Sequence, residues 1–347
     1  YMLTSDLAIY DHFEGSLTLI ANAINWDGSD DRVDEAYQDA LQRLDKMKIL
    51  VSDSLPAHIT LPTAKEEHTF ERNMTSEEYC HKVEKIKEEI HSGEAFQVVL
   101  SQRFSMKLEC EPLDVYRVLR VQNPSPYMYL FRFENDLAVV GSSPEALVKV
   151  NGEEVLVHPI AGTRKRSANT EEDQKIGEEL LADPKERAEH VMLVDLGRND
   201  LGRVCKAGSL EVIEFMKLER YSHVMHIVST VIGKLKESEN AIKALYAVFP
   251  AGTLSGAPKP SALKIIEKLE PVRRGIYGGT IGYIDFNGNL DTCIAIRTAV
   301  IKDGKAYVQA GAGVVADSIP SSENEECLNK AAAVLGAISA ANMMASK

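Results

Sequence analysis

The stretch KAYVQAGAGVVADS, residues 305–318, separates two fold classes. Residues 311–316 match the G-x-G-x-x-A pattern of a dinucleotide-binding turn, in which a helix begins at the last small residue. Val314 and Val315 instead continue an apolar, strand-like run, and helical spacing begins only after Pro320. The stretch therefore reads as a glycine-bearing strand, which argues against a parallel nucleotide-binding sheet.

The segments around this strand indicate the fold class. AFQVVLSQRF (95–104) and LAVVGSS (137–143) are further short strands, and they mix with long helices in no regular alternation. Thr75 begins a helix with the capping-box sequence Thr-Ser-Glu-Glu. That helix ends at Gly93, and its apolar stripe consists of Tyr79, Val83, Ile86 and Ile90. We predict an α+β fold in which large antiparallel sheets pack together with flanking helices.

The first part of the chain differs from the rest. SLTLIANAI (16–24) alternates like a strand, VDEAYQDALQRLDKMKIL (33–50) has helical spacing, and the polar segment 53–73 is typical of a linker. We therefore predict that residues 1–73 are the remainder of an N-terminal region and that residues 74–347 form the catalytic region. The strand-like start of the chain fits a fragment of a longer protein.

Composition excludes several classes of function. The chain is 44% apolar and 26% charged, and its net charge of −13 argues against sequence-independent nucleic-acid binding. No apolar run approaches the about 18 residues of a membrane span, and the N-terminus lacks the pattern of a signal peptide. The five cysteines are scattered and never in CxxC spacing, as in reduced intracellular proteins. We expect a cytoplasmic protein with neither nucleic acid nor membrane as a partner.

Two segments place pairs of carboxylates on helices. In residues 183–204, Asp183 is a predicted N-cap before Pro184, and Glu186 and Glu189 share one helix face. In residues 321–341, the same spacing recurs at Glu323, Glu326 and Lys330, above an apolar stripe of Leu328, Ala331, Leu335 and Ile338. The carboxylates could be ordinary surface charges, with Glu186 completing a capping box and Glu326 pairing with Lys330. The surface-charge reading is favoured by spacing alone, but the two pairs could also jointly hold one magnesium ion.

Seven ordered motifs resemble one enzyme family. They are PIAGTR, ERAEHVMLVDLGRNDLGRV, YSHVMHIVS, GTLSGAPK, YGGTIGYIDFNGNLDTCIAIRT, QAGAGVVADS and ENEECLNKA. In this order they resemble the large subunits of anthranilate synthases, within the chorismate-utilising enzymes, from about residue 5 to the C-terminus. The resemblance implies antiparallel sheets with helices outside and an active site in a cleft.

The resemblance also implies a reaction and its partners. The family reaction is that of a lyase in tryptophan biosynthesis, which converts chorismate and ammonia to anthranilate and pyruvate with magnesium. A glutamine amidotransferase subunit supplies the ammonia, so we expect a hetero-oligomer, and tryptophan is the feedback inhibitor. Because a protein of net charge −13 does not attract the chorismate dianion, local cations and the metal must bind it.

Binding residues follow from the motifs that match. The resemblance implies that Glu189 and Glu326 ligate magnesium directly, with Glu186 and Glu323 positioning them or ligating through water. The predicted contacts to a chorismate carboxylate are Tyr277, Arg297, Lys330 and the backbone of Gly311, Ala312 and Gly313. Further substrate contacts are predicted at Gly162, Thr163 and Thr253.

Catalytic roles follow in the same way. Glu145 matches the family's general acid for the departing C4 hydroxyl, which requires a raised pKa, and Thr253 belongs to the same predicted catalytic set. His226 matches the base that removes the C2 proton, although it could also be a core histidine. His223, three residues earlier, provides a comparison for His226.

Two positions address the nucleophile. Aminodeoxychorismate synthases have a lysine where this chain has Ala161, and relatives that add water have a lysine where it has Gln97. Neither amine is present, which favours free ammonia. The basic run Arg164 to Arg166 is interpreted as a solvated rim of the cleft.

The inhibitor site is matched only in part. The tryptophan-binding residues that the resemblance implies are Pro126, Tyr127, Met128, Tyr283 and Cys293. The other half of that site belongs to a segment of the family that this sequence does not contain.

Three alternatives remain open at this stage. The chain could be an aminodeoxyisochorismate synthase, which stops before pyruvate leaves, or another chorismate-utilising enzyme such as aminodeoxychorismate synthase component I. It could also be a paralogue that binds without catalysis, but the matches at Glu145, Glu189, His226, Arg297 and Glu326 argue against that reading.

Overall fold

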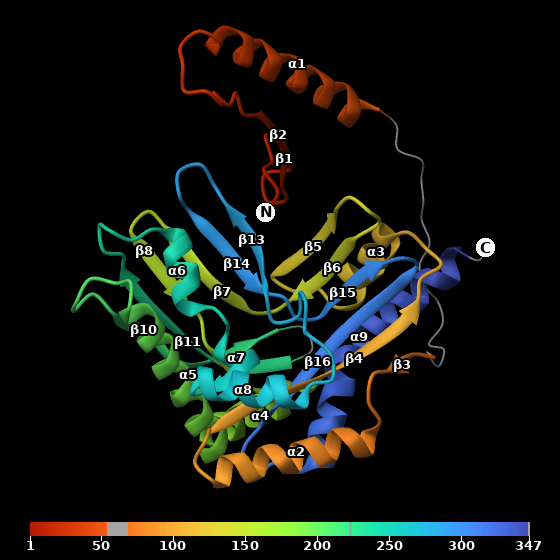
Figure 1. Cartoon of the computed structure of the whole chain (residues 1–347), viewed down its shortest axis with the longest axis vertical. Helices are drawn as coiled ribbons and strands as arrows, with labels where there is room; N and C mark the ends of the chain where they lie inside the picture. Colours follow the sequence, from red (N-terminus) through yellow and green to blue (C-terminus); the bar gives the residue numbers. More distant parts are fainter. Residues whose placement is uncertain (54–68, 222–223, 346–347) are drawn as a thin grey trace. The chain divides into compact units, whose positions relative to one another are not determined.

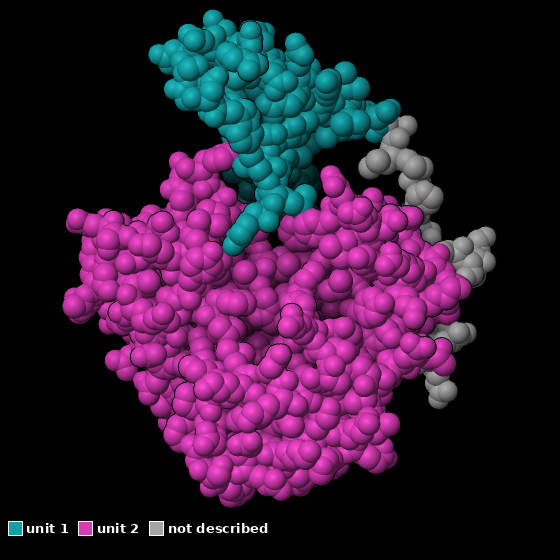
Figure 2. All heavy atoms as spheres, viewed as in Figure 1, with its two compact units in different colours: residues 1–60 teal, residues 61–347 magenta. Residues whose placement is uncertain are grey.

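The computed structural model describes residues 1–53, 69–221 and 224–345. It divides the chain into two compact units, residues 1–60 and 61–347, which Figure 2 draws in separate colours. Most of the predicted linker, residues 54–68, lies outside the described residues. The last residues of that predicted segment include the short strand β3 (Glu71–Arg72), which pairs with a strand of the second unit.

The first unit has the two kinds of element that its sequence predicts. Strands β1 (Asp6–Asp11) and β2 (Ser16–Ala21) form an antiparallel hairpin, and helix α1 follows at Val33–Ser52. Among the described residues of this unit, Ala40 is the buried apolar side chain.

The second unit contains two seven-stranded sheets (Figure 1). The first runs in the order β10 (Glu211–Arg220), β11 (Val224–Lys234), β8 (Glu154–Val157), β7 (Ala146–Asn151), β14 (Leu290–Ile294) and β13 (Thr280–Ile284), and β9 (Ile160–Lys165) pairs with β11. The second runs in the order β12 (Gly256–Ala257), β4 (Gln97–Lys107), β16 (Lys305–Val314), β15 (Thr298–Lys302), β6 (Ala138–Ser143) and β5 (Tyr127–Arg132), with β3 beside β4. Every pairing within the described residues is antiparallel, which confirms the predicted fold class.

Strand β16 is the stretch 305–314, and it pairs with β4 from Lys305 opposite Lys107 to Val314 opposite Val98. Side chains alternate across a strand. Ala312 and Val314 are therefore buried on one face of the sheet, in an apolar cluster with helix α2 (Ser76–His91). Gly311 and Gly313 face the other way, so that face of the strand carries no side chain at these two positions.

Helices cover the sheets. Helices α3 (Pro112–Gln122) and α9 (Pro320–Ala345) pack on the second sheet, as Figure 1 shows for α9 behind β16. Helix α8 (Lys259–Leu269) packs on β4 beside α2. The first sheet has α5 (Pro184–Gly202) and α6 (Ala241–Val248) against it, while α4 (Thr170–Ala182) contacts β9 to β11 and the short α7 (Gly252–Ser255) precedes β12.

The local helix signals are confirmed. The Thr75 hydroxyl accepts from the Glu78 amide while the Glu78 carboxylate accepts from the Thr75 amide, which is a complete capping box. Asp183 caps α5 with Pro184 at its first position. Helix α9 begins at Pro320, and its predicted apolar stripe packs on the second sheet.

The two sheets contact each other through a small apolar cluster. Cys293 of β14 packs with Tyr129 of β5 and Val139 of β6. This contact brings the turn between β14 and β15, which carries Arg297, next to both sheets. None of the helices that the structure describes has both the length and the apolar character needed to cross a membrane.

Candidate active site

His226 lies on β11 directly opposite Thr163 of β9. Its Nδ1 lies 2.9 Å from the carbonyl oxygen of Gly162 and 3.1 Å from the Thr163 hydroxyl. A carbonyl oxygen can only accept, so Nδ1 carries the proton and the lone pair lies on Nε2. Burial lowers the pKa of His226, which favours the neutral imidazole. The ring is therefore held in the form that a general base requires.

Gly162 gives β9 its shape at this point. Its φ of +65° is in the left-handed region, and the register between β9 and β11 shifts between His226 and Ile227. A Cβ at this position would also lie 3.0 Å from the Leu180 side chain and 3.1 Å from the Glu186 carboxylate. Glycine therefore lets the carbonyl of residue 162 reach His226.

Glu145 lies in the connection between β6 and β7 and accepts a hydrogen bond of 2.9 Å from the Thr253 hydroxyl of α7. Desolvation raises the pKa of Glu145 to about 7, although the Thr253 hydrogen bond and the charges of Lys330 and Arg297 oppose that shift. The carboxyl is therefore partly protonated near neutral pH, which is the property that the predicted general acid requires.

Arg297 has an exceptional environment for a guanidinium. Its φ is +51°, and its carbonyl oxygen accepts from the Ser142 amide at 3.1 Å. Within the described residues its side chain makes no hydrogen bond or ion pair, and burial lowers its pKa. A desolvated cation with no partner is costly unless an anion binds to it. The site is thus suited to a carboxylate ligand.

Strand β16 and helix α9 form another side of the site. Lys330 donates to the Gly311 carbonyl oxygen at 3.1 Å and pairs with Glu326 one turn earlier. A Cβ on residue 311 would lie 2.9 Å from the Tyr277 hydroxyl, and a Cβ on residue 313 would lie 2.5 Å from the Gln97 amide nitrogen. Ala312 is buried on the opposite face, so only its backbone could contact a ligand here.

The four predicted metal-site carboxylates act on one another. The pKa of Glu189 is raised, first by desolvation and then by the charges of Glu186 and Glu326. The pKa of Glu323 is raised by desolvation and by the charge of Glu326. The charge of Glu326 on α9 thus contributes to the pKa of Glu189 on α5.

The carboxylates also have nearby partners that the sequence did not reveal. Gln97 donates to Glu189 at 3.2 Å, and its own side-chain oxygen is buried without a partner in the described part of the chain. Arg164 pairs with Glu186 at 2.9 Å and with Asp183 at 3.2 Å. Glu186 and Glu326 are thus paired with cations, whereas Glu189 and Glu323 form no ion pair within the described residues.

These donors fit magnesium. The described residues contain no group of three or more His, Cys, Asp or Glu side chains arranged to hold a metal ion. Magnesium, however, commonly takes only one or two protein carboxylates and completes its shell with waters and substrate oxygens. Glu189 and Glu326 would supply two such carboxylates, and a cation would relieve the repulsion by which Glu326 raises the pKa of Glu189.

The interpretation of the basic run 164–166 as a solvated rim is wrong for its two arginines. Arg164 pairs with residues of α5, and Arg166 pairs with the buried Asp173 of α4 at 2.7 Å. Alternate residues of a strand point to the same face, so both arginines face the two helices while Lys165 is exposed. The run holds α4 and α5 against β9.

The predicted inhibitor residues are only partly assembled. Tyr127 and Cys293 contact the same apolar cluster, and the Tyr127 hydroxyl donates to Asp291 at 2.9 Å. Met128 packs on the other face of β5, and Tyr283 is 64% exposed. Pro126 directly precedes β5, and His223, the residue chosen for comparison with His226, lies outside the described residues.

Comparison with known proteins places the chain among enzymes that act on chorismate. A family model described as chorismate binding enzyme matches residues 1–336. Anthranilate synthase component 1 of Mycobacterium tuberculosis is 56% identical over 350 residues, covering 99% of this chain and 67% of that protein. The chain thus spans about two thirds of the length of the curated relatives it matches.

Solved structures agree. The crystal structure of anthranilate synthase component I from Streptococcus pneumoniae has a TM-score of 0.83 and 39% identity, covering 95% of this chain and 72% of that chain. The menaquinone-specific isochorismate synthase of Escherichia coli has a TM-score of 0.78 at 23% identity, covering 93% of this chain and 72% of that chain, which indicates the same fold.

Proposed function

Because the chain belongs to the chorismate binding enzyme family, we propose that it is the large component of an anthranilate synthase. It would convert chorismate and ammonia to anthranilate, pyruvate and water. The observation that carries the proposal is Arg297, an unpaired guanidinium close enough to both Glu145 and His226 to shift their pKa values. An anion bound to Arg297 would therefore be near both a proton donor and a proton acceptor.

The chain's own residues account for both proton transfers. Arg297, Tyr277 and the backbone at Gly311 and Gly313 bind a substrate carboxylate, and Lys330 adds positive charge beside them. In the first step ammonia bonds to C2 of the ring while the C4 hydroxyl departs as water with the proton of Glu145. The Thr253 hydrogen bond orients that carboxyl.

The second step uses His226. Its Nε2 takes the proton from C2, the ring becomes aromatic, and the bond to the enolpyruvyl oxygen breaks to release pyruvate. The Gly162 carbonyl stabilises the imidazolium that results, because it accepts from Nδ1–H. Such a base favours a full conversion to anthranilate over an enzyme that stops at the amino intermediate.

Magnesium is part of the proposal. Glu189 and Glu326 would hold the ion, with Glu186 and Glu323 orienting them, and the bound ion would neutralise the ring carboxylate of chorismate. Gln97 would fix the Glu189 carboxylate, and Arg164 would keep Glu186 in place.

The remaining assignments rest on the same family relationship. We infer that a glutamine amidotransferase subunit supplies ammonia in a hetero-oligomer, that the reaction is that of a lyase in tryptophan biosynthesis, and that tryptophan inhibits it. A cytoplasmic location fits the scattered free cysteines.

One incubation tests the function. The protein is mixed with chorismate, magnesium and an ammonium salt at alkaline pH, and anthranilate is followed by its fluorescence. We expect anthranilate and an equal amount of pyruvate. Accumulation of isochorismate, or of an amino intermediate without pyruvate, would instead identify another reaction of this family.

The choice of ammonia as nucleophile has its own test. Ala161 lies on β9 opposite Ile227, two residues before Thr163, and offers no amine. We expect Ala161→Lys to lose ammonia-dependent anthranilate formation and to form a covalent adduct with chorismate, detectable by mass spectrometry, because a desolvated lysine is a neutral nucleophile. Ala161→Ser, which is nearly isosteric, should keep much of the activity. Anthranilate formation at the normal rate by the lysine variant would place residue 161 away from the reacting carbon.

A further inference from the structure

A buried ion pair lies beside the site and outside the predicted set of site residues. Arg274 and Glu270 follow helix α8, and their side chains are 17% and 4% exposed. The guanidinium and the carboxylate form two parallel contacts, of 2.9 Å from Nε to Oε2 and 2.6 Å from Nη2 to Oε1. This bidentate geometry fixes the plane of the guanidinium.

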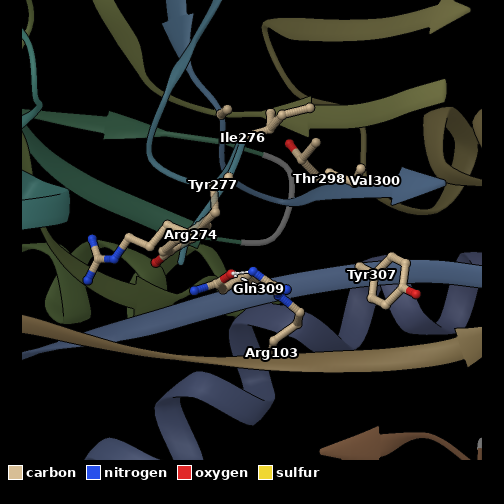
Figure 3. Close-up of a pocket in the computed structure, with 10 residues that line it drawn as sticks. Arg103, Arg274, Ile276, Tyr277, Thr298, Val300, Tyr307 and Gln309 are labelled. Carbon is tan, nitrogen blue, oxygen red and sulfur yellow. Dashed lines mark hydrogen bonds between the residues drawn. The ribbon is translucent and has the colours of Figure 1, made fainter. Parts of the chain in front are cut away.

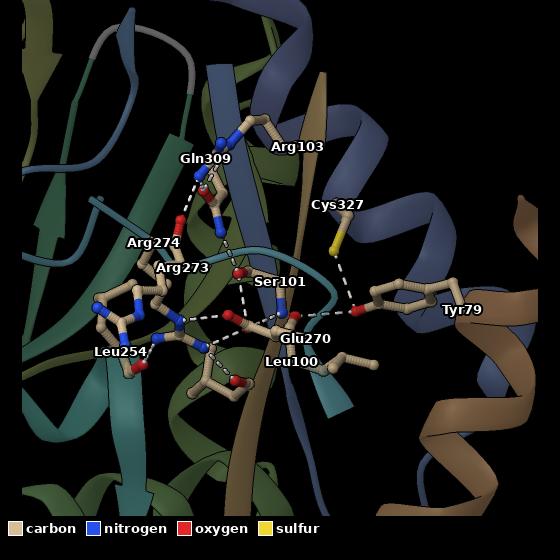
Figure 4. A network of polar contacts seen from close by, with 11 residues as sticks. Tyr79, Leu100, Ser101, Arg103, Leu254, Glu270, Arg273, Arg274, Gln309 and Cys327 are labelled. Atoms are coloured by element: carbon tan, nitrogen blue, oxygen red, sulfur yellow. Dashed lines mark hydrogen bonds and ion pairs between the residues drawn. The ribbon is translucent and has the colours of Figure 1, made fainter. Parts of the chain in front are cut away.

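Arg274 uses its remaining donors on two backbone carbonyls. Nη1 donates to the Leu254 oxygen at 2.5 Å, and Nη2 donates to the Val99 oxygen at 2.7 Å, as Figure 4 shows for Leu254. Leu254 directly follows Thr253 in α7, and Val99 pairs with Gly313 in the ladder of β4 and β16. One side chain therefore ties α7 to the strand beside the proposed carboxylate site.

Arg274 also contacts Tyr277. Its guanidinium carbon lies 5.5 Å from the centre of the Tyr277 ring, and its carbonyl oxygen accepts from the Tyr277 amide at 3.3 Å. Both residues line a cavity of about 200 Å³ together with Gln309 and Thr298 (Figure 3). The Tyr277 ring also packs against the apolar cluster of the first sheet, so the Arg274 contact fixes it from the side of the cavity.

Glu270 extends the network to β4. Its Oε1 accepts from the backbone amide of Ser101 at 2.8 Å and from the Ser101 hydroxyl at 2.7 Å. Ser101 pairs with Gly311, and its hydroxyl accepts from Gln309 at 2.7 Å. The ion pair is thus connected to both glycines of β16 through the strand opposite them.

We infer that Arg274, oriented by Glu270, is a positioning residue that fixes Thr253 and Tyr277 relative to the glycine face of β16. Its own donors point to protein acceptors, so it acts on the substrate through these residues and not by direct contact. The inference rests on the proposed function in one respect, because its kinetic tests measure the formation of anthranilate.

The expected consequence is specific to Thr253. Loss of the Arg274 bond to Leu254 frees α7, which weakens the hydrogen bond from Thr253 to Glu145. That hydrogen bond lowers the pKa of Glu145, as do the charges of Lys330 and Arg297, neither of which bonds to Arg274. The rate requires the protonated carboxyl, so the alkaline limb of the pH–rate profile should move to higher pH.

The test compares four proteins: wild type, Arg274→Lys, Thr253→Val and Arg103→Lys. Arg103 is the matched control, because it borders the same cavity and bonds to Gln309 and the Arg273 carbonyl, with no bond to α7 or Tyr277. We expect Arg274→Lys to move the alkaline limb in the same direction as Thr253→Val and to raise the KM for chorismate at least tenfold. Arg103→Lys should change neither quantity.

A second readout does not depend on activity. Hydrogen exchange should become faster in the peptides covering 251–256 and 275–279 of Arg274→Lys, and not in Arg103→Lys. If the wild type makes no anthranilate, the proposed function is wrong. The hydrogen-exchange comparison still tests whether Arg274 positions Thr253 and Tyr277. If Arg274→Lys does not fold, Glu270→Gln, which keeps the shape of the partner, replaces it with the same expectations. The inference is wrong if the alkaline limb of the pH–rate profile and the KM for chorismate do not change. It is also wrong if hydrogen exchange becomes faster evenly over the whole chain, because the ion pair would then only stabilise the fold in general.

Discussion

At the scale of single residues, burial shifts the pKa of each group that moves a proton, and one hydrogen bond opposes that shift and orients the group. The Thr253 hydroxyl donates to Glu145, and this bond opposes the desolvation that raises the pKa of the carboxyl to about 7. The Gly162 carbonyl accepts from Nδ1 of His226 and so leaves Nε2 free. The surroundings of the two side chains therefore give Glu145 the role of an acid and His226 the role of a base.

The pH dependence of the wild type should follow from Glu145. Only the protonated carboxyl can donate to the departing hydroxyl, so the rate, expressed per concentration of free ammonia, should fall as pH rises through about 7. Glu145→Gln should lower kcat by about 10²- to 10⁴-fold and remove this limb. Steady-state anthranilate fluorescence from pH 5.5 to 9 measures both effects. A glutamine variant with an unchanged limb would assign the titration to another group.

His226 predicts a split between the two chemical steps. His226→Ala should slow aromatisation by about 10²- to 10⁴-fold and leave ring amination less affected, because the base acts only on the C2 proton. Rapid quenching and mass spectrometry should then detect an amino intermediate that still carries the enolpyruvyl group. Equal losses in both steps would indicate that the ring has a structural role, in which it contacts Tyr221 edge to face.

At the scale of secondary-structure elements, two helices bring like charges together. Helix α5 begins at Pro184 behind an aspartate cap and α9 begins at Pro320, so the predicted metal-site glutamates lie in the first two turns of each helix. Desolvation, together with the charges of neighbouring carboxylates, raises the pKa of Glu189 on α5 and of Glu323 on α9. Repulsion of this kind is costly unless a cation occupies the space between them.

Replacing one of the proposed direct ligands tests this arrangement. Glu326→Gln should weaken magnesium binding at least tenfold and remove most activity, because one of two charged ligands is lost. Isothermal titration with magnesium alone reports the binding without turnover. Glu325→Gln, a change to the exposed neighbour on the same helix, is the matched control and should bind magnesium like the wild type. Unaltered magnesium affinity in Glu326→Gln would move the metal site elsewhere.

The elements also show where sequence reasoning works. The capping boxes and stripes depend on residues within one turn of each other, so Thr75, Asp183 and Pro320 predict three helix starts. The antiparallel character of the sheets follows from short strands without regular crossover helices. The class of fold could therefore be read from local pattern.

Contacts between distant segments could not be read in this way. Arg164 had no visible partner in the sequence, because Glu186 reaches it only when α5 packs on β9. The bond between Gln97 and Glu189 joins residues 92 positions apart. Glu270 and Arg274 have the i, i+4 spacing of an ion pair, but nothing local indicates that the pair reaches Leu254 and Val99. The family motifs supplied the site residues; the residues that hold them required the structure.

At the scale of the whole molecule, segments from the beginning and the end of the second unit pair with each other. Strand β4 begins at Gln97 and its long ladder partner β16 ends at Val314, while α9 covers both. The site draws on residues from Gln97 to Lys330, so it depends on nearly the whole of the unit.

A C-terminal truncation tests this pairing. A chain that stops at Asp303 lacks β16 and α9, which leaves β4 with an unpaired edge and removes much of two apolar clusters. We expect insoluble protein with no cooperative thermal transition, since an exposed apolar strand edge invites pairing between chains. A chain that ends at Asn342, beyond the stripe of α9, should remain soluble and unfold cooperatively. Soluble, cooperative unfolding of the shorter chain would show that β16 is dispensable for the core.

The pairing of β4 with β16 has a consequence for synthesis on the ribosome. The two strands are separated by about 200 residues of chain, which take on the order of 10 to 40 seconds to translate. During that interval β4, with Val98, Leu100 and Phe104 along it, has no ladder partner on the β16 side. Nascent chains should therefore depend on chaperones that shield this strand, and no nascent chain can bind substrate before Lys330 has left the exit tunnel.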